Sequence, residues 1–263
     1  MKLPFTQVDA FADRPFTGNP AAVLPLEAWL PDELLQAIAL ENNLSETAFT
    51  IPCTDGEANY ELRWFTPTVE VALCGHATLA SGHVLIGERE AVRFRTRKAG
   101  VLTVARDGDE LTLDLPATPV AAASHDALLA ALGTPEGEVF LSTGGPEDTA
   151  IVLLDDEAAV RAAAPDMPAL AATGIMAIVT APGSGGTDVV SRVFVPSWGI
   201  DEDPVTGAAH AALVPFWAER LGRKRLSFYQ ASARGGDLGG RTAGERVILS
   251  GRCVTMIEGT MRI

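Results

Sequence analysis

Two segments of this sequence would be apolar around their whole circumference as helices. Residues 77–86 and 208–217 consist mainly of small and aliphatic residues, and each contains one histidine but no Asp, Glu, Lys or Arg. A helix without a polar face is buried on every side. We therefore expect two enclosed helices, and Pro215 should kink the second one or displace its last turn.

Other segments have the patterns of strands and of an amphipathic helix. Residues 101–115 form two β-rich runs around the turn 107–109 and predict a β-hairpin. Residues 44–51 and 192–195 are also expected to be strands. Residues 31–43 carry leucine and isoleucine on one face only, and predict a helix that begins at a proline and ends near two asparagines.

Several landmarks occur twice at a nearly constant spacing. The pairs are Pro67 with Pro196, Gly75 with Gly207, and Gly108 with Gly244, which are 129, 132 and 136 residues apart. These spacings are close to half of 263 residues and predict two lobes, 1–116 and 117–263, between which terminal strands cross over. The alternative is that two unrelated hairpins share glycine turns. We expect an α+β fold of two pseudo-repeated lobes, each a curved mixed sheet wrapped around a central buried helix.

The charge of the chain is strongly negative. It has 34 Asp+Glu against 20 Lys+Arg, a net charge of −14. Such a protein repels phosphate backbones and anionic lipids, so we expect no nucleic-acid partner and no membrane association. No apolar run approaches the ~20 residues of a membrane span, and the first residues lack the pattern of a secretion signal. A cytoplasmic location is expected.

Three cysteines (Cys53, Cys74 and Cys253) form no CxxC pair, and no histidine lies at a ligand spacing from them. We therefore expect neither a disulfide framework nor a bound metal. Cys74 stands at a helix start, where a thiolate is stabilised. A racemase with two opposed thiols is excluded because residues 201–213 contain no cysteine; a single-thiol mechanism stays open.

Each enclosed helix follows a turn that contains glycine, Leu73–His76 in the first half and Asp203–Gly207 in the second. The first amides of a helix have no internal partner, and that end is electropositive. Glycine lets a ligand approach the backbone, so these turns predict sites for a carboxylate or an enolate. We expect the two helix starts to converge on one cleft. The alternative is that both glycines only permit close packing of helix on sheet.

Two side chains in the first half have the chemistry of proton transfer. Glu46 lies in the otherwise uncharged run 43–49, and a partly buried carboxylate there is a candidate general acid/base. It is otherwise a strand glutamate that points to solvent. His76 lies in the first helical turn, where the helix dipole favours neutral imidazole. It is otherwise a polar residue that only completes the helix start.

Further polar candidates come from turns. Asp203 precedes Pro204 and either caps its own turn, orients a substrate group or holds His76. Asn19 belongs to a turn that either offers an amide to the cleft or is only a turn. Arg234 follows Gln230 and either binds a substrate carboxylate or lies in a hairpin loop.

Four groups of residues occur in an order that characterises one protein family. They are Val8–Phe11 with Phe16–Val23, Asn43–Phe49, Cys74–Thr78 and Asp203–His210. Together they resemble the phenazine-biosynthesis PhzF-type isomerase family, which has the diaminopimelate epimerase-like fold. The resemblance extends over nearly the whole chain.

The resemblance implies a cofactor-free enzyme of two similar lobes that is commonly a homodimer. The best-known activity of the family is isomerisation of a dihydro-hydroxyanthranilate by proton transfer. By similarity, Glu46 is the acid/base. Gly75, His76 and Asp203 hold the substrate.

The chain departs from the family pattern at two positions. Ala208 stands where the usual motif has serine, so a hydroxyl expected to bind substrate is missing. Ala231 follows Gln230 where the family often has glycine. These departures question whether the phenazine precursor is the substrate of this chain.

The leading hypothesis is a cofactor-independent isomerase that moves a proton on a small carboxylate-bearing substrate. Glu46 carries the proton, and the helix-start amides at Gly75 and Gly207 stabilise the developing charge. Asn19 and Ala208 complete the expected substrate site. Two alternatives stay open. One is a thiol enzyme that acts through the cysteine before Gly75, and the other is a non-catalytic small-acid binding protein, which the missing serine hydroxyl suggests.

Overall fold

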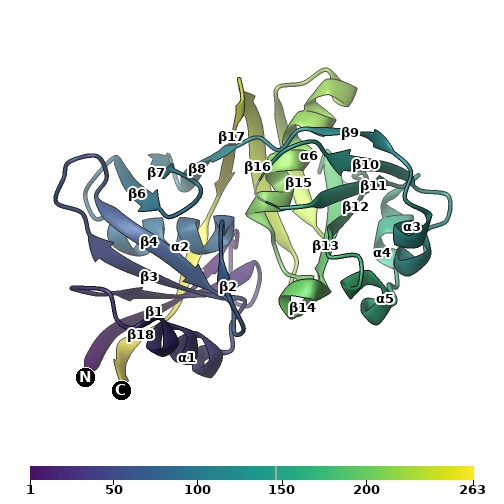
Figure 1. The fold of residues 1–263 in the computed structure, drawn as a ribbon. Coiled ribbons are helices and arrows are strands. Elements are labelled where there is room, and N and C mark those ends of the chain that lie inside the picture. The colour runs from purple at the N-terminus through teal and green to yellow at the C-terminus, as the bar shows by residue number, and fades with distance from the viewer. Residues whose placement is uncertain (146) are drawn as a thin grey trace. The chain divides into compact units, whose positions relative to one another are not determined.

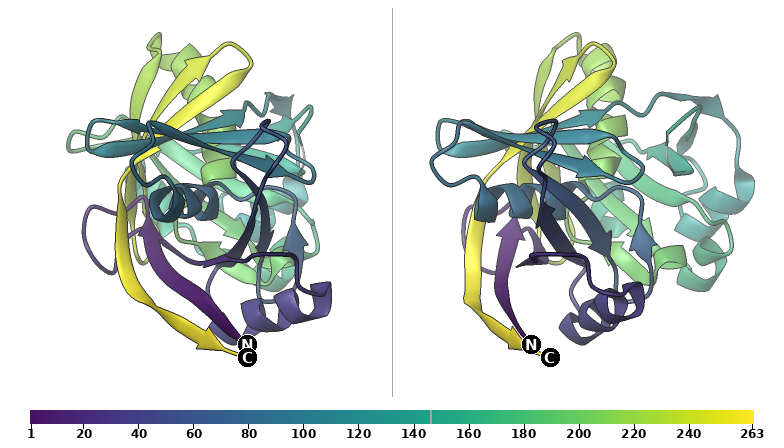
Figure 2. Two further views of the ribbon diagram at one scale, coloured as in Figure 1. Left: turned by 90° about the vertical axis from the view of Figure 1, so that its left-hand side faces the viewer. Right: turned by 60° about the vertical axis from the view of Figure 1, so that its left-hand side comes forward.

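The computed structural model describes residues 1–145 and 147–263 and divides the chain into two units (Figure 1). The first unit is Met1–Asp114 with Ser250–Ile263, and the second is Leu115–Leu249. The division falls two residues before the expected boundary. The last strand, β18 (Cys253–Arg262), belongs to the first unit because it pairs antiparallel with β1 (Lys2–Ala10). Figure 2 shows these two strands side by side, with both termini together.

The first unit contains two helices and a mixed sheet. Its sheet order is β18–β1–β2–β3–β4–β6–β7–β8, in which the pairs β2/β3 and β4/β6 are parallel and the others antiparallel. The short β5 pairs with the end of β4. The remaining elements are β2 (Asn19–Pro25), α1 (Asp32–Asn42), β3 (Glu46–Pro52), β4 (Tyr60–Phe65), β5 (Glu70–Val71), α2 (Gly75–Leu85), β6 (Ala91–Thr96), β7 (Val101–Asp107) and β8 (Glu110–Pro116).

The second unit has the same kind of sheet. Its order is β9–β10–β11–β12–β13–β15–β16, with β11/β12 and β13/β15 parallel, and β14 pairs with the end of β13. Its elements are β9 (Val120–Ala123), α3 (Asp126–Leu132), β10 (Glu138–Ser142), β11 (Thr149–Leu153), α4 (Glu157–Ala162), α5 (Met167–Ala171), β12 (Met176–Pro182), β13 (Val189–Val195), η1 (Pro196–Trp198), β14 (Ile200–Asp203), α6 (Gly207–Leu221), β15 (Arg225–Gln230), β16 (Gly236–Ala243) and β17 (Arg246–Gly251).

The pairing pattern repeats strand for strand. In each unit a parallel pair is followed by an antiparallel strand, a short side strand, a buried helix and a strand parallel to the earlier one. The mixed sheets and helices confirm the predicted α+β class. None of the helices in the described part of the chain combines the length and apolar character that crossing a membrane requires.

Burial explains the composition of the strands. In the first unit α2 contacts β1, β2, β3 and β7, while α1 contacts β3 and β4. Strands covered on both faces are apolar throughout, as in β2, where residues 21–24 are all buried. β8 alternates instead, because only Leu111, Leu113 and Leu115 face the interior.

Two strand predictions need correction at their starts. The strand expected from Leu44 begins at Glu46, because α1 ends at Asn43 in the left-handed conformation (φ 49°) and the next two residues complete the turn. The strand expected from Arg192 begins earlier, at Val189, where it pairs with β12 and β15. Both starts depend on pairing with distant segments.

In each unit the buried helix contacts the sheet where a glycine on one element faces a valine on the other. A Cβ on Gly82 of α2 would lie 2.7 Å from the Cβ of Val104 on β7. In the second unit the sizes are exchanged, since a Cβ on Gly240 of β16 would overlap Val214 of α6. Each contact thus holds one valine and one glycine, and the close approach requires the glycine.

Pro215 lies inside α6 and does not end it, since the helix continues to Leu221. A proline cannot donate to the carbonyl four residues earlier, which is that of Ala211. The Thr118 N–H donates to this carbonyl instead, at 3.1 Å. The backbone group that Pro215 leaves without a helical partner is thereby satisfied.

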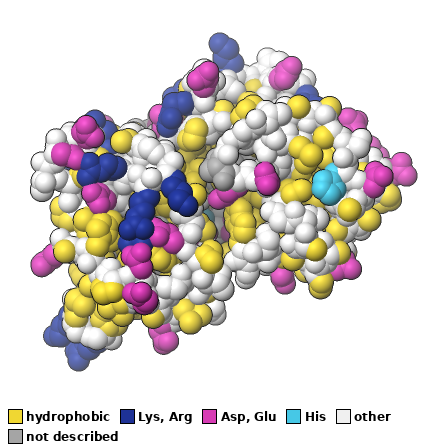
Figure 3. All heavy atoms as spheres, in the orientation of Figure 1, with side chains coloured by type: hydrophobic (Ala, Val, Ile, Leu, Met, Phe, Trp, Pro, Cys, Tyr) yellow, Lys and Arg dark blue, Asp and Glu magenta, His cyan; other side chains and the backbone are white. Residues whose placement is uncertain are grey.

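In each unit an arginine on a long strand holds a glutamate of the short strand beside it. Arg63 on β4 donates two hydrogen bonds to Glu70, at 2.7 and 2.8 Å, and Arg192 on β13 donates two to Glu202, at 2.7 and 2.9 Å. Two parallel bonds hold a guanidinium in one orientation. On the face of the first unit in Figure 3, Lys and Arg side chains lie beside Asp and Glu rather than in a separate patch.

The exchanged glycine–valine contacts predict a coupled pair of substitutions. Gly82→Val alone should lower the free energy of unfolding by about 1–3 kcal/mol or more, because the new side chain collides with Val104. Adding Val104→Gly reproduces the arrangement of the second unit and should restore at least about 1 kcal/mol relative to the sum of the single changes. Urea denaturation of the four proteins measures this coupling. If the changes in the free energy of unfolding of the two single variants add up to that of the double variant, steric contact between the two positions is refuted.

Candidate active site

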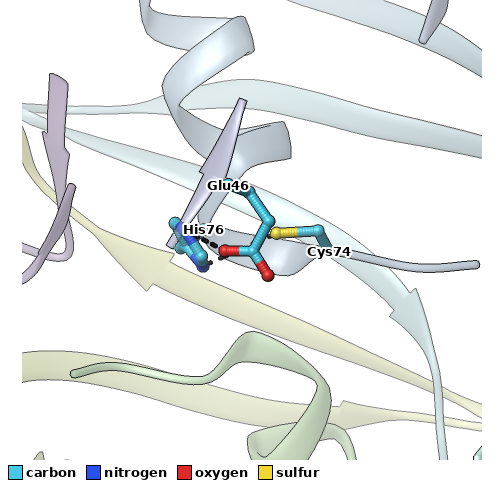
Figure 4. Close-up of side chains that lie close together, drawn as sticks. All are labelled: Glu46, Cys74 and His76. Atoms are coloured by element: carbon cyan, nitrogen blue, oxygen red, sulfur yellow. Dashed lines mark hydrogen bonds and ion pairs between the residues drawn. The ribbon is translucent and has the colours of Figure 1, made fainter. Parts of the chain in front are cut away.

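The carboxylate of Glu46 and the imidazole of His76 are in direct contact. Glu46 Oε2 lies 3.0 Å from His76 Nε2, and both residues are buried, with 8% and 2% of their surface exposed. Figure 4 shows the two side chains pointing toward each other from the start of β3 and the start of α2, with Cys74 beside them. Glu46 therefore does not point to solvent.

Asn19 determines which nitrogen of His76 carries the proton. The Asn19 Nδ2 lies 3.1 Å from His76 Nδ1. An amide NH₂ only donates, so Nδ1 accepts and the proton of the neutral ring is on Nε2. The protonated Nε2 of His76 then faces the carboxyl group of Glu46 across the 3.0 Å contact. Asn19, His76 and Glu46 thus form one chain of polar contacts inside an apolar unit.

The backbone brings these residues together in three ways. Gly18 has φ +67° and no room for a side chain beside the Ala10 carbonyl, so the turn places Asn19 as the first residue of β2. Glu46 is the first residue of β3, which runs parallel to β2. Parallel neighbours begin at the same edge of a sheet. α2 begins with Gly75, one residue before His76.

The start of α2 offers backbone donors. The first bond of the helical pattern runs from Thr78 N to Cys74 O, at 3.3 Å, and the cap residue Cys74 makes no side-chain bond to the helix amides. The amides of Gly75, His76 and Ala77 precede that bond. They give the helix end its positive potential, which favours a negative ligand.

Cys74 is the third member of this cluster. Its Sγ lies 3.5 Å from His76 Nδ1, and 5% of the residue is exposed. Cys53 and Cys253 lie outside this cluster, and burial raises the pKa of both thiols, that of Cys253 to about 12. Among the described residues, Glu46, Cys74 and His76 form the group of side chains that could ligate a metal ion.

The second unit contains its own buried polar cluster at the start of α6. Thr206 Oγ1 donates to Asp203 Oδ2 at 2.5 Å, and Gln230 Nε2 donates to the Asp203 carbonyl at 2.7 Å. The Gln230 Oε1 accepts from Thr206 N at 2.9 Å. Gln230 is fully buried at the end of β15 and closes the turn before the helix. The carboxylate of Asp203 is thereby held by its own turn.

His210 lies one turn into α6 and is fully buried. Its Nδ1 donates to the Thr206 carbonyl at 2.8 Å, and Nε2 has no hydrogen-bond partner among the described residues. The corresponding residue of α2 is Thr78, whose Oγ1 donates to the Cys74 carbonyl. Burial lowers the pKa of His210 to about 4.

The structure thus brings Asn19, Glu46 and His76 together beside Gly75 within the first unit. The other predicted residues belong to the second unit, where Asp203 ends β14 and Gly207 and Ala208 begin α6. Sequence reasoning did not identify the contact of Cys74 with His76 or the clamp formed by Thr206 and Gln230. The available signal for the clamp is a glutamine at the next inward-facing position of its strand after Leu226 and Phe228.

Known proteins resemble this chain over nearly its whole length. The PhzC-PhzF family profile, described as phenazine biosynthesis-like protein, matches residues 8–259. The chain is 50% identical to an uncharacterized isomerase of Pseudomonas aeruginosa over 100% of both chains, and 37% identical to the human phenazine biosynthesis-like domain-containing protein over 99% of both.

Solved structures give the same result. The crystal structure of a PhzF-family phenazine biosynthesis protein from Enterococcus faecalis has a TM-score of 0.89 at 43% identity, with 100% of both chains covered. A hydroxyproline epimerase from Agrobacterium vitis has a TM-score of 0.63 at 17% identity, over 98% of this chain and 92% of the other, and shares the fold. The relatives named as isomerases support an enzyme of the isomerase type.

The lowered pKa of His210 predicts a loss of stability in acid. Below its usual pKa of about 6.5 the unfolded chain takes up a proton that the folded protein takes up only near pH 4. The free energy of unfolding should therefore fall by about 3 kcal/mol as the pH falls from 6.5 to 4, in addition to other groups. In His210→Thr the new hydroxyl can donate to the carbonyl four residues earlier, as Thr78 does in the first unit. This variant should lack the part of the pH dependence of the free energy of unfolding that His210 contributes. Equal slopes of urea-unfolding free energy against pH in both proteins would contradict it.

Proposed function

This chain belongs to the PhzC-PhzF family of phenazine biosynthesis-like proteins, and we propose that it is an isomerase that moves a proton on a small carboxylate-bearing substrate without a cofactor. The observation that supports the proposal most directly is the buried contact between Glu46 and His76 at the start of α2. It places a proton acceptor next to a group of backbone donors that favours a negative ligand.

In the proposed reaction Glu46 takes a proton from an acidic C–H of the substrate and returns it to another carbon of the conjugated skeleton. Glu46 Oε2 is held by His76, which leaves Oε1 as the oxygen that meets the substrate. The electron pair of the broken C–H bond becomes an enolate or dienolate. The amides at Gly75 stabilise that negative charge during the transfer.

His76 and Asn19 are proposed to keep the carboxylate ready for this reaction. The contact of His76 Nε2 with Glu46 Oε2 keeps the carboxyl group in one orientation. Asn19 keeps the imidazole in the tautomer that makes this possible. In the second unit, Asp203, Gly207 and Ala208 are proposed to bind the substrate as well. The chain is proposed to act as a homodimer in the cytoplasm.

A second candidate is thiol chemistry at Cys74. The 3.5 Å separation from His76 Nδ1 pairs a thiol with a potential base, and a helix start favours thiolate. A third possibility is a protein that binds small acids without turnover. Ala208 motivates it, because the serine hydroxyl of the family motif is missing there.

Hydrogen exchange tests the leading proposal. We expect the protein, incubated in D₂O with a panel of unsaturated and amino-substituted small carboxylates, to incorporate solvent deuterium into one of them, detected by NMR. Glu46→Gln should slow that exchange by about 10²–10⁴-fold while the melting temperature is retained. The exposed Glu41→Gln on α1 is the matched control and should leave the rate unchanged. Binding without exchange in the unmodified protein would favour the binding-only alternative.

Substitution of Cys74 separates the two catalytic proposals. If Glu46 carries the proton, Cys74→Ser should keep the exchange rate within about tenfold, and iodoacetamide should react slowly with the buried thiol. Rapid alkylation of Cys74, together with loss of exchange in Cys74→Ser but not in Glu46→Gln, would replace the carboxylate mechanism by the thiol mechanism. Peptide mass spectrometry identifies the alkylated cysteine.

A further inference from the structure

Three buried side chains present three different metal-binding atoms to one point. Glu46 offers a carboxylate oxygen, Cys74 a sulfur and His76 an imidazole nitrogen, and these atoms all lie within 4.8 Å of one another. The residues are 8%, 5% and 2% exposed. The spacing of cysteines and histidines along the chain predicts no metal site. Glu46 lies 28 residues before Cys74, however, and joins this group of ligands only in the folded chain.

The separations are close to those of ligands around one ion. Ligands of a tetrahedral zinc site, with bonds of about 2.0–2.3 Å, lie roughly 3.3–3.7 Å from each other. Glu46 Oε2 is 3.0 Å from His76 Nε2, and Cys74 Sγ is 3.5 Å from Nδ1 of the same ring. Since the sulfur lies nearer Nδ1, an ion bound to Nε2 requires the thiol to move toward that nitrogen. The backbone on which all three residues stand is a strand start and a helix start.

We propose that Glu46, Cys74 and His76 bind one thiophilic divalent cation of the Zn²⁺ type, and that the bound ion inhibits the enzyme. The ion displaces the thiol proton into solvent, so that a carboxylate and a thiolate neutralise its two positive charges. One sulfur, one nitrogen and one oxygen suit Zn²⁺ or Co²⁺. Mg²⁺ and Ca²⁺ prefer oxygen ligands throughout and should not compete.

Asn19 can support both states of the imidazole. In the structure its amide nitrogen lies 3.1 Å from His76 Nδ1. When Nε2 binds a metal, the proton of the neutral ring moves to Nδ1, and a histidine ligand then donates to an oxygen. The amide of Asn19 presents its oxygen after a half-turn, at no cost in burial. A buried amide in this position is therefore compatible with metal binding.

Inhibition follows from the identity of the ligands. A coordinated Glu46 carboxylate no longer accepts a substrate proton, and a coordinated His76 Nε2 no longer carries a proton that faces it. This consequence rests on the proposed function, whereas the binding itself does not. The two claims therefore need different readouts.

Cobalt is the probe for binding, because Co²⁺ bound to a thiolate gives a charge-transfer absorption in the near ultraviolet. Protein treated with a chelator and then kept in a phosphine reductant should develop this band with one equivalent of Co²⁺ and lose it when Zn²⁺ is added. Cys74→Ser should abolish the band. Glu46→Gln should weaken Zn²⁺ binding, measured calorimetrically, by at least about tenfold. Cys53→Ser is the matched control and should retain both signals.

Several outcomes would overturn the site. They are absence of the band in the unmodified protein, an unchanged band in Cys74→Ser, or loss of the band in Cys53→Ser. Melting temperatures that are unchanged in the variants show that the band is lost without loss of the fold.

In the deuterium-exchange assay Zn²⁺ should reduce the exchange rate of the unmodified protein in proportion to the occupancy of the site. The rate of Cys74→Ser should be much less affected. Loss of exchange on chelation alone would contradict inhibition and make the ion a requirement. A cobalt band in a protein that catalyses no substrate exchange would refute the proposed function but would not refute the metal site.

Discussion

The burial of α2 over its first two turns is the constraint on which the first unit depends. Residues 75–82 are all buried, so the helix consists of small and apolar residues and its polar side chains must find partners inside. Thr78 and Ser81 satisfy their hydroxyls on the carbonyls of Cys74 and Ala77. Only the first turn, where the amides have no helical acceptor, can present polar groups to anything else. The chemistry of the unit therefore gathers there.

This constraint explains why the site is a short chain of contacts rather than a broad polar surface. A buried carboxyl group is costly without a polar neighbour, and His76 Nε2 lies 3.0 Å from it. The imidazole in turn is oriented by Asn19. Each member contacts the next, so the loss of one would leave a buried polar group without its polar neighbour. Cys74 also lies close to His76, because it is the cap residue of the helix whose first turn contains His76.

The two units keep their scaffold and differ in chemistry. The parallel and antiparallel pairings correspond, and an arginine holds a carboxylate in each unit. Where α2 carries His76, α6 carries Ala208 at the equivalent position, and its turn is closed by Gln230 instead. Packing of helix on sheet requires only that the combined volume of the two contacting side chains fills the space between them. One glycine and one valine fill it whichever of them is on the helix. A repeat can therefore conserve its architecture while its polar residues change.

The sequence alone determined the α+β class and the family, because burial periodicity and local turn chemistry are properties of neighbouring residues. It also placed Glu46 and His76 among the candidates. Tertiary structure decided that Glu46 meets His76, that Asn19 selects the imidazole tautomer, and that Gln230 closes a turn 24 residues before it along the chain. Such contacts depend on strand register and on parallel neighbours that begin at one edge of a sheet. No local pattern encodes that register, since it results from pairing between segments far apart in the chain.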